Sequence, residues 1–199
     1  MQTKTECKTH LERTEFTRAA LVSAARQLFT EKGYAKTSTP EIVAVANVTR
    51  GAMYHHFADK ADLFLAVAVQ CAQEVAESVG GGSHDSTSPL HALMQGAEAY
   101  FEAMAGGGRA HLLLVQAPSV LSVEQRLRIR ELAGEKELHD GLAAALPAGI
   151  ATQTPLPELT TLISAAFDHA ALAIATGGSP EKYKAAMRVL ISQLTREPG

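Results

Sequence analysis

The sequence predicts an all-α protein of about nine helices. The chain has 199 residues, is 46% hydrophobic, and contains four Tyr, six Phe and no Trp. Long runs rich in Ala, Leu and Glu carry apolar residues at helical spacing, and stretches with Gly or Pro punctuate them. No alternating pattern typical of a strand is present. Such a chain is long enough for one or two compact units with an apolar core.

Cysteine usage favours a reducing compartment, and the hydropathy pattern favours a soluble protein. The two cysteines, Cys7 and Cys71, are far apart in the sequence and suggest neither a disulfide framework nor a metal knuckle. The chain shows no charged-then-apolar leader and no apolar run of about 18 residues. We therefore expect a soluble cytoplasmic protein without a membrane partner.

The first predicted helix follows a polar segment. Residues 1–13 have no apolar periodicity and are expected to form a flexible arm. Apolar residues recur at helical spacing from Thr14 onward, which predicts a helix over about 15–32, and Gly33 is expected to cap its end.

The next two predicted helices are short and closely spaced. Ser38 and Glu41 form a capping-box pattern with Pro40 in the first turn, which predicts a helix over about 39–46. Asn47 tolerates the left-handed conformation of a sharp turn.

Thr49 is a good N-cap for a helix over about 50–56, and Asp59 with Asp62 opens a longer helix over about 60–79. Two helices of about two turns, joined by a sharp turn, match the helix-turn-helix pattern.

The remaining chain is predicted to form a second, helical domain from residue 63 to 199, after an N-terminal domain at 1–62. A segment rich in Gly and Ser at 80–88 separates the long fourth helix from the rest. Further helices are expected at about 89–105, 109–117, 122–146, 156–176 and 180–195.

Charge is distributed unevenly along the chain. The net charge is −3 and the pI is near 6.2. Residues 1–62 carry a balance of +2 and the remainder a balance of −5. A mildly basic N-terminal quarter on an acidic body is typical of a protein that touches phosphate at one end.

Residues 48–64 concentrate hydrogen-bond donors on a short element. In the second helix of a helix-turn-helix, Arg50 can make a bidentate contact with guanine, while Gly51 and Ala52 allow close backbone approach. Tyr54, His55, His56 and, on the next helix, Lys60 can donate to phosphates.

The alternative is a packed corner in which these polar atoms bond neighbouring turns. His56 is as well suited to supporting the fold as to contacting phosphate, and Ala52 is small enough for either setting.

The run KGYAKTSTPEIVAVANVTRGAMYHHFADKADLF resembles the DNA-binding domain of the TetR family of bacterial transcriptional regulators. The resemblance covers residues 15–65, with Asn47 where that family usually has Gly. It implies base-proximal roles for Arg50, Gly51, Ala52 and Tyr54. It also implies phosphate contacts to double-stranded operator DNA by Ser38, Thr39, Thr49, Tyr54, His55 and Lys60.

The resemblance also implies a homodimer. The last two predicted helices support it, because they contain more apolar positions than one core face requires, and small residues permit close helix approach. An internal bundle in a monomer is the alternative. The candidate residues of the dimer interface, called the seam below, are Ala165, Ala166, His169, Ala170, Leu172 and Leu190, together with Ala171, Ala173 and Ala175.

The resemblance also implies that the second predicted domain binds a ligand. An apolar small-molecule effector is expected between the middle helices. Candidate lining residues are Met94, Tyr100, Phe101, Met104, Leu113, Leu132 and Phe167, with Arg109, His111, His139 or His169 adding polarity.

An enzyme, or a ligand-binding protein without specific DNA binding, is the alternative function. A di-metal helical bundle needs Glu-x-x-His pairs, and none occurs in the sequence. Phosphate-loop and nucleophile-elbow motifs are also absent. We therefore expect no catalysis, no cofactor and no metal site.

Overall fold

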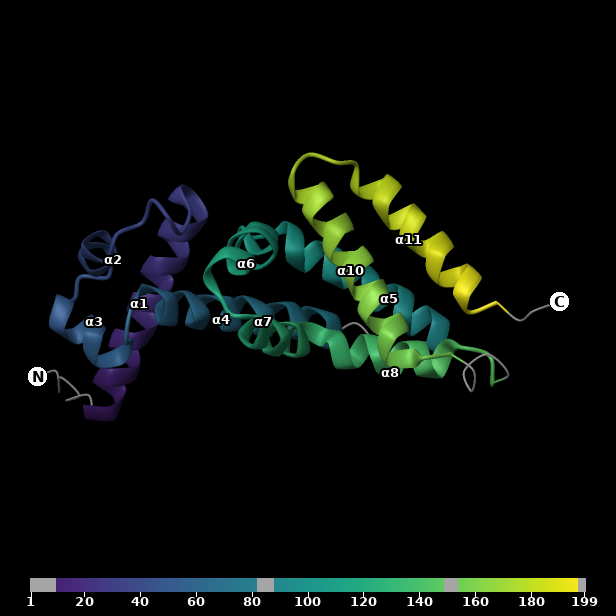
Figure 1. Cartoon of the computed structure of the whole chain (residues 1–199), viewed down its shortest axis with the longest axis horizontal. Coiled ribbons are helices and arrows are strands. Elements are labelled where there is room, and N and C mark those ends of the chain that lie inside the picture. The colour runs from purple at the N-terminus through teal and green to yellow at the C-terminus, as the bar shows by residue number, and fades with distance from the viewer. Residues whose placement is uncertain (1–9, 82–87, 149–153, 197–199) are drawn as a thin grey trace, which may run out of the picture. The chain divides into compact units, whose positions relative to one another are not determined.

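The computed structural model describes residues 10–81, 88–148 and 154–196, with side chains from Glu12 onward, and these residues form helices and connecting turns without strands (Figure 1). The all-α class is thus confirmed. The chain divides into two compact units, Met1–Val67 and Ala68–Gly199, and the division lies a few residues beyond the predicted 62/63 boundary.

The first unit contains α1 (His10–Lys32), α2 (Thr39–Val45), α3 (Arg50–His56) and the start of α4 (Lys60–Gly80). Each short helix is fixed by local signals. Ser38 and Glu41 form the predicted capping box at α2, and the Thr49 hydroxyl accepts from the amide of Ala52 at α3. Asn47 adopts the expected left-handed conformation, with φ of 53°.

The core of the first unit gathers one face of each of its helices. Phe29, Ile42, Met53 and Phe64, from α1 to α4 in turn, are each fully buried. Phe29 and Phe64 pack with Tyr34 as an aromatic trio, with ring centroids 5.3–5.5 Å apart. This packing supplies the stability that helices of two turns lack in isolation.

The second unit contains the rest of α4 and the helices that follow. They are α5 (Pro89–Ala105), the π-helical η1 (His111–Gln116), α6 (Ala117–Val120), α7 (Val123–Arg130), the π-helical η2 (Glu131–Glu135), α8 (Lys136–Ala145), α10 (Leu156–Ala175) and α11 (Pro180–Leu194).

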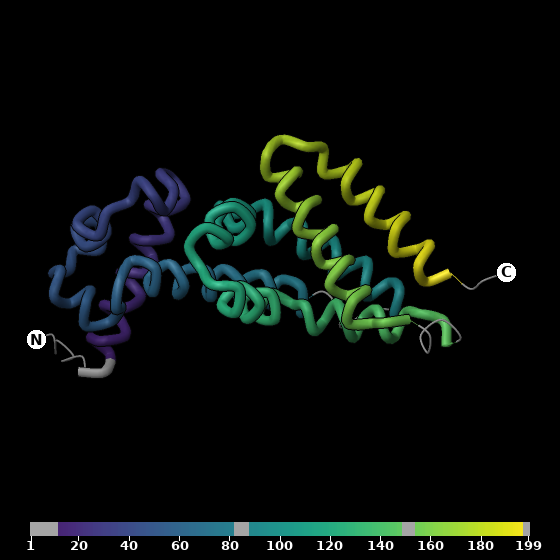
Figure 2. The backbone as a smooth tube through the Cα atoms, in the orientation of Figure 1, coloured from purple at the N-terminus to yellow at the C-terminus, as the bar shows by residue number. Residues whose placement is uncertain are grey.

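The core of the second unit lies where α5, α8, α10 and α11 meet. Phe101, Leu142, Phe167 and Ile191 are buried there, one from each helix. After the turn that follows α10, α11 runs back alongside it (Figures 1 and 2). By length and composition alone α4 and α10 would also reach across a membrane, and both helices contribute residues such as Val75 and Phe167 to the core.

Three predicted boundaries were wrong. Helix α1 begins at His10, so residues 10–13 are helical rather than part of a flexible arm, and residues 1–9 lie outside the described part. The helix predicted to end at 117 continues to Val120, with Pro118 in the first turn of α6 directly after the π-helical η1.

The third correction concerns the single helix predicted over 122–146. It is divided into α7, η2 and α8, and within η2 Gly134 has φ of 109°. A residue with a side chain rarely adopts that φ, so the kink requires glycine. Sequence periodicity continues across the kink and does not reveal it.

Candidate functional site

Helix α3 separates an inward face from an outward one. Met53 and Phe57 are buried, while Arg50, Gly51, Tyr54 and His55 are exposed, with 45% of Tyr54 accessible. The separation follows from the helical period, since residues three and four apart share a face. The structure therefore brings the predicted DNA-contacting side chains of α3 together on one open surface.

Gly51 leaves space over the start of α3. A Cβ added there would meet only the Thr49 hydroxyl oxygen, at 3.9 Å. Nothing inside the protein therefore requires glycine at this position. The open backbone would allow a large partner to approach closely.

Arg50, Tyr54 and Thr39 form a polar group across the two short helices. The guanidinium carbon of Arg50 lies 5.5 Å from the centroid of the Tyr54 ring. Hydrogen bonding to Arg50, and then to Thr39, lowers the pKa of the Tyr54 hydroxyl. These contacts hold Tyr54 beside the start of α2 and limit the freedom of Arg50.

Ser38 is occupied by its capping role. Its hydroxyl donates to Glu41 Oε2 at 2.8 Å and accepts from the Glu41 amide at 3.4 Å. Lys32 Nζ lies 2.7 Å from Glu41 Oε1, and this bond, followed by those from Ser38, lowers the Glu41 pKa to about 2. The polar groups at the start of α2 therefore bond to one another within the protein.

Lys60, a predicted phosphate contact, also makes contacts within the fold. Its ammonium donates to the carbonyl oxygens of Tyr34 and Thr37, each at 2.9 Å. The same nitrogen lies 4.0 Å from the Tyr34 ring centroid. Burial lowers the Lys60 pKa. Lys60 thus fastens the loop between α1 and α2, and its phosphate contact stays a prediction.

The two adjacent histidines differ. His55 is exposed, whereas His56 is partly buried and packs near Phe57, with ring centroids 6.4 Å apart. Burial, followed by the charges of His55 and Arg18, lowers the pKa of His56. The fold-supporting role considered for His56 agrees with this position.

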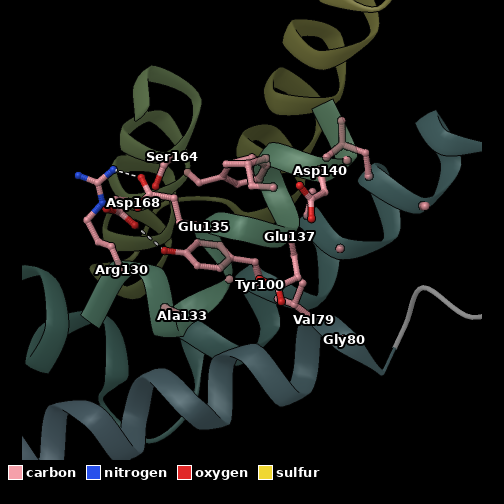
Figure 3. Close-up of a pocket in the computed structure, with 18 residues that line it drawn as sticks. Val79, Gly80, Tyr100, Arg130, Ala133, Glu135, Glu137, Asp140, Ser164 and Asp168 are labelled. Carbon is pink, nitrogen blue, oxygen red and sulfur yellow. Dashed lines mark hydrogen bonds and ion pairs between the residues drawn. The ribbon is translucent and has the colours of Figure 1, made fainter. Parts of the chain in front are cut away.

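A cavity of about 330 Å³ lies within the second unit. It is lined by the end of α4, by α5, by the segment from α7 to α8 and by α10 (Figure 3). Its volume is near the lower end of the usual range for small-molecule sites, roughly 300–1,000 Å³.

Of the predicted ligand-contacting residues, only Tyr100 and Phe167 line this cavity. Phe101 and Met104 are buried in the core, and Met94 and Leu113 pack against it. The lining does not include Leu132, His139, His111 or His169.

Arg109 ties helices together instead of lining the cavity. Its guanidinium bonds Glu74 at 2.9 Å, and it donates to the carbonyl oxygens of Ala103 at 2.7 Å and Gly106 at 3.0 Å. Arg109 therefore joins the end of α5 to α4.

The cavity walls that sequence reasoning missed come from η2 and from small residues. Gly96 of α5, Gly134 of η2 and Gly141 of α8 all line the space. A Cβ on Gly141 would lie 3.1 Å from Leu93 Cδ1, so glycine allows α8 to approach α5. The glycines inside the predicted helices were the sequence signal that could have located this cavity wall.

Polar groups gather on one side of the cavity. The Tyr100 hydroxyl donates to Asp168 Oδ1 at 2.5 Å, and Arg130 forms an ion pair with Glu135 beside them (Figure 3). Burial, more than any other cause, raises the pKa values of both Tyr100 and Asp168.

The predicted seam residues do not share one surface. Ala170 is only 4% exposed and lies in the core, and Ala166 packs against that core. Ala165, His169 and Leu190 are exposed, while Leu172 is partly buried. Large apolar residues that sequence reasoning missed, Leu162 and Val189, are 69% and 62% exposed.

A helix-turn-helix unit, and a second helical unit that holds a cavity of its own, define the class as a two-unit helix-turn-helix protein. Residues 21–67 match the family model of bacterial regulatory proteins of the TetR family. Residues 90–197 match the tetracyclin repressor-like C-terminal domain. The chain belongs to the TetR family.

Curated relatives match over only part of their length. The HTH-type transcriptional repressor BepR of Brucella suis is 36% identical over 98 residues, which are 49% of this chain and 47% of that protein. The regulator AcrR of Shigella flexneri is 50% identical over 48 residues, 24% of this chain and 22% of that protein. The chain thus matches less than half the length of these relatives.

Solved structures match over nearly the whole chain. A TetR-family transcriptional regulator from Pectobacterium atrosepticum is 28% identical, with a TM-score of 0.71, covering 96% of this chain and 100% of that one. A TetR-family regulator from Syntrophomonas wolfei has a TM-score of 0.75 at 17% identity, covering 91% and 95%, and this likeness shows the fold alone.

Replacing Lys60 with Met is expected to destabilise the protein. The variant loses two hydrogen bonds from a charged donor and a cation–π contact, so we expect a loss of about 1–3 kcal/mol in the free energy of unfolding. Urea denaturation measures it. Lys36→Met removes the same charge from an exposed side chain and should change stability little; equal stability of both variants would contradict the structural role of Lys60.

Proposed function

We propose that the protein is a sequence-specific DNA-binding transcriptional regulator, a repressor that an apolar small-molecule effector releases from DNA. The observation that carries the proposal is the outward face of α3, where Arg50, Tyr54 and His55 surround an unobstructed glycine. In a helix-turn-helix protein the corresponding helix enters the major groove of DNA.

Within this proposal, the residues divide into two roles. Arg50, Gly51, Ala52 and Tyr54 lie near base edges, and Arg50 is the candidate for a bidentate contact with guanine. Contacts with phosphates on either side fix the register without reading sequence. The proposed phosphate contacts are Ser38, Thr39, Thr49, Tyr54, His55 and Lys60.

Changing Arg50 to Ala is expected to weaken specific binding by about 1–3 kcal/mol and to relax the preference at one base position. Fluorescence anisotropy with an operator duplex and its single-base variants measures both effects. Arg128→Ala removes an equally charged, exposed residue from α7, outside the helix-turn-helix, and should bind normally. If Arg50→Ala kept wild-type affinity and base preference, the assignment of α3 to DNA reading would be wrong.

We also propose a homodimer formed through the outward faces of α10 and α11. Leu162 on α10 and Val189 and Leu190 on α11 are large apolar side chains left exposed in the protomer. Ala165 and His169 are also exposed on α10. The same face on a second copy would cover them, as a two-fold interface requires.

Replacing Leu162 or Val189 with Glu is expected to convert the dimer to a monomer and to reduce operator affinity with it. A buried, unpaired charge at the seam is strongly unfavourable, yet each position is exposed in the protomer, so folding should persist. Light scattering measures the mass. Val123→Glu alters an apolar residue that is 63% exposed on α7 and should leave the dimer intact; dimers in all three variants would place the interface elsewhere.

The proposed switch acts through α4. In a two-fold dimer the reading helices must lie about 34–36 Å apart to enter successive major grooves. One end of α4 begins at Lys60, and its other end contributes Val79 and Gly80 to the cavity lining. An effector that prefers a displaced α4 would change the spacing and lower DNA affinity, and linkage requires operator DNA to weaken effector binding equally.

A helical-bundle enzyme, or a binding protein without specific DNA recognition, is the competing class. Regulators of this family are not enzymes, and we propose the same for this chain, with the cytoplasm as its compartment. In the part of the chain that the structure describes, no three His, Cys, Asp or Glu side chains are grouped to hold a metal ion. A specific mobility shift with DNA upstream of its own gene distinguishes the two classes.

A further inference from the structure

The cavity of the second unit has an apolar and aromatic wall. Val79, Ala92, Leu93, Ala97 and Leu138 line it, together with the rings of Tyr100 and Phe167. Those two rings meet edge to face, with centroids 5.7 Å apart. Such a wall fits an apolar ligand, and aromatic rings also attract a cation placed over their faces.

Charged residues in the lining are mostly acidic. Four carboxylates, Glu135, Glu137, Asp140 and Asp168, face one cation, Arg130. Asp168 and Glu135 gather near the Tyr100 hydroxyl, while Glu137 and Asp140 lie elsewhere around the space (Figure 3). Carboxylates come from η2, α8 and α10, so the acidic character is a property of the cavity rather than of one helix.

Ion pairs leave some of these carboxylates without a compensating cation. Arg130 pairs with Glu135, and Asp140 pairs with Lys136 at 2.7 Å. Asp168 accepts a hydrogen bond from the neutral Tyr100 hydroxyl and shares the nearby charge of Arg130 with Glu135. Among the described residues, Glu137 has no ion pair. A ligand cation would offset the charge that remains in the cavity.

We propose that the cavity binds a small apolar molecule that carries a positively charged amine. The amine lies near Asp168 and the ring of Tyr100, and the apolar body packs against Leu93, Leu138 and Phe167. The role of such a molecule as an effector rests on the regulatory function proposed above.

One feature favours an anion instead. Arg130 lines the cavity, and its Nε is buried without a hydrogen-bond partner. However, the same guanidinium is already paired with Glu135, and Asp168 lies close to it. A carboxylate ligand would therefore meet two like charges beside this single cation.

A matched ligand series tests the inference. Phenylbutylamine, phenylbutanol and phenylbutanoate share one apolar body and differ in the charge at its end. Calorimetry with the full chain should give binding of the amine at least about tenfold tighter than the alcohol, with the carboxylate weakest. Tighter binding of the carboxylate, equal binding of all three, or binding of none would each overturn the proposal.

Single substitutions locate the effect. Asp168→Asn retains an oxygen that accepts from the Tyr100 hydroxyl and should lower amine affinity about tenfold while leaving alcohol affinity nearly unchanged. Glu137→Gln changes an exposed side chain that cannot disturb the core, and it should lower amine affinity by a few-fold. Glu158→Gln, on α10 like Asp168 but outside the lining, should have no effect.

The variants also separate a binding change from misfolding. If Asp168→Asn unfolds, Glu137→Gln still decides the question, and unchanged amine preference in Glu137→Gln and in any folded Asp168→Asn protein would overturn the proposal. Operator affinity measured with and without the amine tests the regulatory role separately. Charge-dependent binding without any change in operator affinity would support the ligand class and contradict effector control.

Discussion

The burial of Met53 and Phe57 is the interaction on which the DNA-binding unit depends. Helix α3 has seven residues, and an isolated helix of that length does not persist in water. Its inward face packs against α1 and α2, and this packing fixes which side chains remain outside. Arg50, Tyr54 and His55 are presented because the opposite face is held.

Local signals explain why the first unit was predictable. The capping box at Ser38, the cap at Thr49 and the left-handed Asn47 each act within a few residues of chain, so the sequence alone identifies them. The helix limits at 39, 50 and 60 were correct for the same reason. What the sequence did not reveal is that Lys60 reaches back to two carbonyl oxygens of the loop before α2.

The second unit was less predictable, because its features depend on which helices meet. Ala166 and Ala170 lie in an alanine-rich run, yet only the fold shows that both face their own core, whereas Leu162 faces outward. The kink at Gly134 forms part of the cavity wall, and it interrupts no apolar period. A prediction from composition therefore found Tyr100 and Phe167 but chose core residues for most of the remaining wall.

The central claim is that a dimer of this protein reads DNA with two α3 helices. Selection from a library of random DNA duplexes, followed by sequencing of the bound fraction, tests it most directly. We expect enrichment of a two-fold symmetric site whose half-sites are centred about one helical turn apart, roughly 10–10.5 base pairs, or a multiple of it. No enrichment, or enrichment of a single half-site without a symmetric partner, would contradict the account.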